Sequence, residues 1–186
     1  AKQGHADAQA NLGLMYAQGK DVNKDDRNAV KLYREAAEQG YVNGQHHLGV
    51  MYQAGLGVTQ DYRQAFRWWR LAAEQGFVQF QYGLGWMYEN GTGITKDDRE
   101  AVRLYRLAAE QGFAHAHSNL AKMYALGRGV TQDDVYAHMW ANIAASLGHP
   151  RGKQNKGLLE GFMTAADITK AESLARECVR KNYKVC

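Results

Sequence analysis

The sequence is poor in proline and cysteine and has no long apolar run, and each shortage excludes a class of structure. Pro150 is the single proline among 186 residues, so long helices are left uninterrupted. No run of about 18 apolar residues occurs, which predicts that no segment spans a membrane. The two cysteines, Cys178 and Cys186, both lie near the C-terminus and leave the redox compartment open.

Patterns typical of metal binding and catalysis are missing as well. The seven histidines include the adjacent pair His46 and His47, which points to different faces of a helix. No H-E-x-x-H and no clustered Cys/His spacing occurs. Ser118 and Ser146 fall within expected helices rather than in a strained turn that would expose a nucleophile. We therefore expect no metal, no cofactor and no enzymatic activity.

The charge balance is mildly basic, with a formal net charge of +4 and a pI near 9.0. Basic residues such as Arg27, Lys31 and Arg34 recur along one helix face, but each such row ends in a glutamate such as Glu38, which partly neutralises it. No aromatic residue interleaves with these cations, as a nucleic-acid surface would need. We expect a solvated face and no nucleic-acid partner, with a bound polyanion as the alternative.

Glycine, by contrast, is plentiful, and many of the 20 glycines recur with a fixed spacing. The step is 36 residues (40−4, 76−40, 112−76, 148−112), and leucine, tyrosine and alanine positions follow it too. The glycines are Gly4, Gly40, Gly76, Gly112 and Gly148. A strict period over four copies indicates a stacked repeat protein. We predict an all-α fold with four repeats in residues 1–148, at about 5–40, 41–76, 77–112 and 113–148, and a terminal cap at 149–186.

Each copy is predicted to form two helices joined by a glycine-containing loop. The apolar positions of the first helix, expected near Asp7–Gln18 in copy one and Gln79–Asn90 in copy three, fall on one face at about 100° per residue. A Gly-x-Gly loop follows in copies two to four, where positive backbone angles are expected. Asp25 and its equivalents then stand where N-caps of the second helix, near Asp26–Glu38, are expected.

Three departures from the pattern carry expectations of their own. Asp21 occupies the slot of the second loop glycine, so we expect it to adopt a left-handed conformation. Ala121 replaces a glycine of the first helix in copy four. Position eight of the repeat is variable, and we hypothesise that Gly44 leaves room that Phe80 fills.

These residues carry a resemblance to a known family. The pattern A-x-x-x-L-G-x-x-Y-x-x-G-x-G-V-x-x-D-x-x-x-A-x-x-W/Y-x-x-A-A-x-x-G, best seen from Leu48 to Asp61, resembles the Sel1-like repeat, a relative of the tetratricopeptide repeat. The resemblance implies a right-handed α-solenoid of stacked helix–turn–helix units that binds proteins or peptides, often in bacterial secretion or envelope settings. A periplasmic or secreted location and a monomer are therefore expected. Because Ala1–Gly4 matches the end of a repeat, we also expect sequence upstream of Ala1.

The last stretch loses the loop glycines and is expected to cap the solenoid. Lys153–Phe162 is predicted as one more first helix. Thr164 begins a capping-box-like motif, followed by an amphipathic helix over Ile168–Arg180. A disulfide between Cys178 and Cys186 requires the chain to fold back after about Asn182, because eight residues of straight helix span about 12 Å.

The candidate binding site lies on the first helices, opposite their buried stripe. These positions do not repeat, so they are free to carry specificity in a concave groove. The predicted partner-binding residues are Asp7, Asn43, His46, Gln79, Tyr82, Trp86, Glu89, His115 and Lys122. Tyr82 and Trp86 form the expected aromatic anchor, ringed by polar side chains. The alternative is a small-molecule binder or enzyme in the same groove, for a β-lactam-type ligand or a hydrolysis. The paired cysteines of the family branch linked to β-lactam binding are absent from these repeats.

Overall fold

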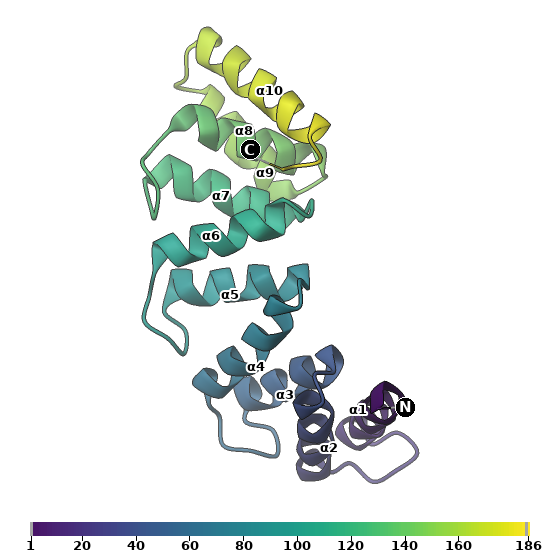
Figure 1. Cartoon of the computed structure of the whole chain (residues 1–186). Helices are drawn as coiled ribbons and strands as arrows, with labels where there is room; N and C mark the ends of the chain where they lie inside the picture. Colours follow the sequence, from purple (N-terminus) through teal and green to yellow (C-terminus); the bar gives the residue numbers. More distant parts are fainter. Residues whose placement is uncertain (1, 185) are drawn as a thin grey trace. The chain divides into compact units, whose positions relative to one another are not determined.

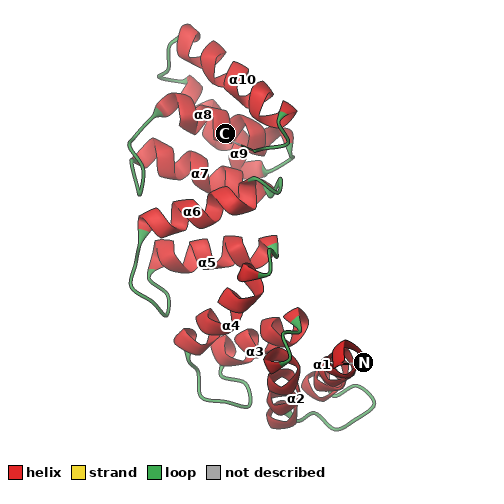
Figure 2. Ribbon diagram, viewed as in Figure 1, coloured by secondary structure: helices red, strands yellow, loops and turns green. Residues whose placement is uncertain are grey.

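The computed structural model describes residues 2–184 and 186, with side chains from His5 onward, and its regular elements are all α-helices (Figure 2). In chain order the helices are α1 (Lys2–Gln18), α2 (Asp26–Glu38), α3 (Val42–Ala54), α4 (Tyr62–Glu74), α5 (Val78–Asn90), α6 (Asp98–Ala109), α7 (Ala114–Leu126), α8 (Asp134–Ser146), α9 (Pro150–Glu160) and α10 (Ala165–Arg180). None of these helices is both long and apolar enough to cross a membrane. The all-helical repeat solenoid predicted from the sequence is confirmed.

The chain divides into two compact units, each built by stacking helix pairs (Figure 1). Unit 1 comprises Ala1–Phe80 with Gly91–Thr95, and unit 2 comprises Gln81–Asn90 with Lys96–Cys186. In unit 1, α1 packs on α2, α2 on α3, and α3 on α4. In unit 2 the same order continues from α6 through α9, and α10 packs on α8. The first helices also meet directly, α1 with α3 and α7 with α9, so their outer faces form a continuous surface within each unit.

Aspartate caps begin the second helices, as predicted. Asp25, Asp61 and Asp97 have extended backbones, and each carboxylate accepts hydrogen bonds from the N–H groups two and three residues later. Asp133 accepts one such bond, from Tyr136. These bonds satisfy backbone donors that have no partner inside the helix. The predicted span Asp26–Glu38 coincides with α2.

The second loop glycine is required by two constraints. Gly57 has a φ of +68°, and a Cβ built on it would lie 2.3 Å from the carbonyl oxygen of Asp26, at the start of the preceding copy's second helix. Gly129 meets Asp98 in the same way, at 2.2 Å. Asp21, which replaces this glycine in copy one, has a φ of 61°, so its predicted left-handed conformation is confirmed.

A second glycine lets an aromatic ring cross the first helix. A Cβ on Gly49 would lie 2.2 Å from the indole nitrogen of Trp69, so the ring packs directly on the backbone. The same indole donates a hydrogen bond to the carbonyl of His46 (3.2 Å). In copy four the residue equivalent to Trp69 is Ala141 (69+72), which is fully buried. The small Ala141 removes the need for a glycine, and this explains Ala121.

The hypothesis about Gly44 is wrong. A Cβ on Gly44 would lie 2.7 Å from the backbone nitrogen of Ala37 and 2.8 Å from the Cβ of Ala36, so α2 rather than Phe80 occupies the space. Phe80 instead contacts the ring of His46, with centroids 5.4 Å apart. Glycine at this position therefore permits close approach of the first helix to the preceding second helix.

The C-terminal pair packs as a cap, with boundaries shifted from the prediction. Helix α9 begins at Pro150 rather than Lys153, because proline is well suited to a first helical turn. Thr164 caps α10 by accepting a hydrogen bond from the N–H of Asp167, and Ala171, Ala175 and Cys178 are buried. After α10 the chain reverses through Asn182 and Tyr183, which both have positive φ. The reversal brings Cys186 back to Cys178, and the two form a disulfide with Cα atoms 5.3 Å apart.

Candidate partner-binding surface

Large apolar side chains are exposed on, or just after, the first helices of unit 2. Trp86, Lys122 and Leu158 occupy the same repeat position on α5, α7 and α9 (122−86 and 158−122 are both 36). Leu126 and Phe162 share the position one turn later (162−126 is 36). Trp86 is 45% exposed, Leu126 59%, Leu158 63% and Phe162 66%. We call these four residues the apolar strip.

Three residues of the apolar strip, Leu126, Leu158 and Phe162, border a hollow between α7 and α9. The hollow has a volume of about 320 Å³ and a mostly apolar wall, which consists of Ala121, Lys122, Ala125, Leu126, Asn155, Leu158, Leu159 and Phe162. In this wall Leu159 is buried, whereas Leu126, Leu158 and Phe162 are open to solvent. An exposed apolar hollow of this kind is a typical docking place for an apolar side chain of another molecule.

Glu89 ties the three helices beside the strip together. Its carboxylate accepts hydrogen bonds from the Tyr105 hydroxyl (2.8 Å), the Lys122 ammonium (2.5 Å) and the Arg128 guanidinium (3.2 Å). Arg128 also forms a two-pronged ion pair with Asp98 at 2.7 and 3.2 Å. Glu89 is only 5% exposed, so the prediction that it forms part of an accessible polar rim is wrong. It holds Lys122 and Arg128 instead.

The cations outweigh burial in setting the charge of Glu89. Burial by itself raises the pKa of this carboxyl, but the hydrogen bonds from Lys122 and Tyr105 and the charges of Lys122 and Arg128 lower it below its ordinary value. Glu89 is therefore ionised at neutral pH. Burial, followed by the bond to Glu89, raises the pKa of the Tyr105 hydroxyl, which stays a donor.

Tyr82 takes part in packing more than the prediction assumed. Its ring is half-buried and lies 5.6 Å from Tyr105, 5.2 Å from Phe113 and 5.8 Å from His115, measured between centroids. His115 in turn meets the ring of His149 at 4.5 Å. Tyr82 thus belongs to an aromatic cluster at the starts of α7 and α9, whereas Trp86 one turn later remains open.

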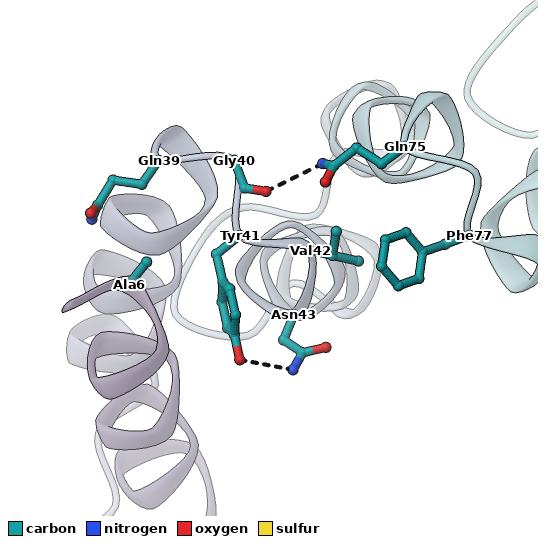
Figure 3. A pocket seen from close by; sticks show the side chains of 8 residues that line it. All are labelled: Ala6, Gln39, Gly40, Tyr41, Val42, Asn43, Gln75 and Phe77. Atoms are coloured by element: carbon teal, nitrogen blue, oxygen red, sulfur yellow. Dashed lines mark hydrogen bonds between the residues drawn. The ribbon is translucent and has the colours of Figure 1, made fainter. Parts of the chain in front are cut away.

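Unit 1 has a second, more polar hollow of about 350 Å³, and one of the residues predicted there, Asn43, lines it. Asn43 donates to the Tyr41 hydroxyl (3.2 Å), which donates to Asp7. Figure 3 shows the side chains of Val42 and Phe77 pointing toward one another across this hollow. Of the other residues predicted here, Gln79 is exposed and does not line the hollow, while His46 is half-buried against His47 and Phe80.

Sequence reasoning missed Leu126, Leu158 and Phe162, although the repeat contained the signal. Leu158 lies two repeats after Trp86 (158−86 is 72), and Phe162 lies two repeats after Asn90. Lys153–Phe162 was predicted as one more first helix, and extending the groove positions into it would have placed both residues on the predicted face. A cap whose only role is to face solvent would carry polar side chains at these positions. The exposure of Leu158 and Phe162 therefore distinguishes this end of unit 2.

The histidines form no cluster suited to a metal among the residues that the structure describes. The basic faces of the second helices are exposed, and some of their arginines pair with nearby glutamates, as Arg70 does with Glu74 and Arg103 with Glu100. The apolar strip therefore stands out as the feature of the described surface best suited to bind another molecule.

The stacked helix pairs define a helical repeat protein. The Sel1 repeat family model matches residues 6–41, 42–77, 78–113 and 114–149. The chain therefore belongs to the Sel1 repeat family, whose members are generally non-catalytic scaffolds for protein interactions. No match is found among curated proteins.

Solved structures agree with this assignment. A protective antigen of uropathogenic Escherichia coli strains with an SLR fold is 36% identical over 96% of this chain, with a TM-score of 0.80. This chain spans only 38% of that antigen. A Sel1 repeat protein from Oxalobacter formigenes is 29% identical over 97% of this chain and 73% of its own, with a TM-score of 0.78.

Proposed function

We propose that this chain is a non-catalytic scaffold that binds a protein or peptide segment on the first-helix surface of unit 2, across the apolar strip. The exposure of Trp86, Leu126, Leu158 and Phe162 on one surface carries the proposal. Repeat packing leaves these side chains in water, where each loses the free energy that burial would give. Burying a large apolar side chain fully contributes about 1.5–3 kcal/mol.

The rigidity of this surface favours binding as well. Trp86 stands one turn before Glu89, whose ion pairs and hydrogen bond hold α5 against its neighbours. A tryptophan has only two side-chain torsions to order, so little conformational entropy is lost when a partner covers it. Tryptophan is also among the residues most enriched at energetically dominant interface positions.

Replacing Trp86 tests the proposal. Trp86→Ala should weaken partner binding by roughly 30-fold, or about 2 kcal/mol, because interface anchors of this kind typically contribute that much. The helical circular-dichroism signal should stay unchanged, since the side chain is exposed. A partner is first isolated by pull-down and then titrated against both proteins in moderate and in high salt.

Arg67→Ala on the exposed face of α4 is the matched control, and it should leave the affinity nearly unchanged. Equal losses from the two variants would reject the apolar strip as the site. Binding that depends on Arg67 and disappears in high salt would instead place a polyanion on the basic faces of the second helices.

A further inference from the structure

An unpaired cation stands on the same helix face as the apolar hollow. Arg151 lies seven residues before Leu158, which places it two turns away on the same face of α9. It is exposed, and no described carboxylate forms an ion pair with it. The charge of Arg151 also acts on Tyr82 of α5. Burial raises the pKa of Tyr82, and the positive charge of Arg151 lowers it.

The carboxylates on the same surface are already occupied. Within unit 2 the first helices contain two of them, Glu89 and Glu160. Glu89 is held by Lys122 and Arg128, and Glu160 by Lys156 and the ring of His138. The described first helices of unit 2 therefore present uncompensated positive charge at Arg151, and both of their carboxylates already have partners. A partner that covers these helices gains from bringing a carboxylate of its own.

We propose that the bound segment is both apolar and acidic: it places an apolar side chain in the hollow between α7 and α9 and an aspartate or glutamate beside Arg151. This inference rests on the proposed function and names the chemistry of its partner. The two anchor points are about 10 Å apart along α9. An extended segment spans that distance with about three residues, and a helical one with about seven.

A selection from random displayed peptides tests the idea even while the natural partner is unidentified. The intact chain is immobilised, and selected peptides are then synthesised and titrated. We expect selected sequences to combine leucine or aromatic residues with at least one aspartate or glutamate at either spacing. Leu158→Ser should weaken their binding by about 30-fold, as for a central apolar anchor. Arg151→Glu should weaken it by about tenfold.

A charge exchange separates this inference from the proposed function. A selected peptide with its acidic residue changed to lysine should bind Arg151→Glu better than it binds the unchanged chain, and Lys31→Glu on α2 should show no such preference. If peptides need Leu158 but show neither acidic enrichment nor recovery in the exchange, the acidic partner is rejected and the proposed function stands. If no selected peptide responds to Leu158→Ser or Trp86→Ala, both are rejected.

Discussion

His117 shows how a single buried side chain couples this fold to pH. Its ring is fully buried between Trp140 and Tyr183, with centroids 5.4 and 5.2 Å away, and neither ring nitrogen has a described hydrogen-bond partner. Burial lowers its pKa to about 4. The unfolded chain, with a histidine pKa of roughly 6.5, takes up this proton first as the pH falls.

The contribution of neutral His117 to stability is therefore complete above pH about 6.5 and is lost as the pH falls toward about 4. The full loss is about 3 kcal/mol, because each pKa unit corresponds to about 1.4 kcal/mol. Urea unfolding across this range should show the decline, and His117→Leu should reduce it, while the remainder includes His46, His47 and His149, whose pKa values burial also lowers. His5→Leu, at an exposed position, serves as the control. An unchanged slope in His117→Leu would contradict this account.

Glu89 marks the limit of sequence reasoning at the residue scale. The equivalent positions in the other copies are Ala17, Gln53 and Ala125, so nothing in the repeat indicates a buried carboxylate. A position that does not recur is expected to be exposed, because it escapes the packing rule of the repeat. The structure shows that a non-recurring residue is also buried when non-recurring partners, here Lys122 and Arg128, are present to balance its charge.

At the scale of the helix pair, the second glycine position of the loop allows two substitutions to be compared, one that adds a Cβ and one that removes it. Gly57→Ala should lower the free energy of unfolding by about 2 kcal/mol or more, since the new Cβ meets both a positive φ and the Asp26 carbonyl. Asp21→Gly should be neutral or stabilise by up to about 1 kcal/mol, because it relieves only the left-handed strain. Chemical denaturation of both variants checks the pair, and a larger cost for Asp21→Gly than for Gly57→Ala would reject the interpretation.

Helix starts and ends were predictable because each signal is repeated. Four aspartates in register identify one capping position far better than a single aspartate does, and α2 matches its predicted span. The role of Gly44 was not predictable, because the contact that requires it comes from the preceding helix pair. Sequence spacing identifies which residues share a face, but not which neighbouring backbone approaches them.

At the scale of the whole molecule, the C-terminal pair covers apolar surface that the last repeat would otherwise expose. Trp140 and Ile143 on α8 are buried, and α10 packs on that helix. Deleting Arg151–Cys186 should cause aggregation or abolish cooperative unfolding, because solenoid ends need a cover with a polar outer face. Analytical ultracentrifugation and thermal melting are the measurements, with Ser173→Ala on the exposed side of α10 as the control. A monomer with an unchanged melting temperature would disprove the cap.

The all-helical solenoid was predictable from the 36-residue period, whereas the surface of unit 2 was predictable only in part. Trp86 was identified from its own copy, because a tryptophan opposite the buried stripe is conspicuous. Leu158 and Phe162 lie in the copy without loop glycines, where the register is harder to follow. Their exposure depends on how α9 packs against α7, which the period alone does not give.

The fluorescence of Trp86 tests the central claim most directly. Among the described residues, Trp86 is the one exposed tryptophan. Subtracting the emission spectrum of Trp86→Phe from that of the unchanged chain therefore gives the emission of Trp86, which acrylamide should quench readily. Saturation with the partner, or with a selected peptide, should shift this difference emission to shorter wavelength and protect it from acrylamide. Saturated binding with unchanged Trp86 emission and quenching would show that the partner does not cover the apolar strip.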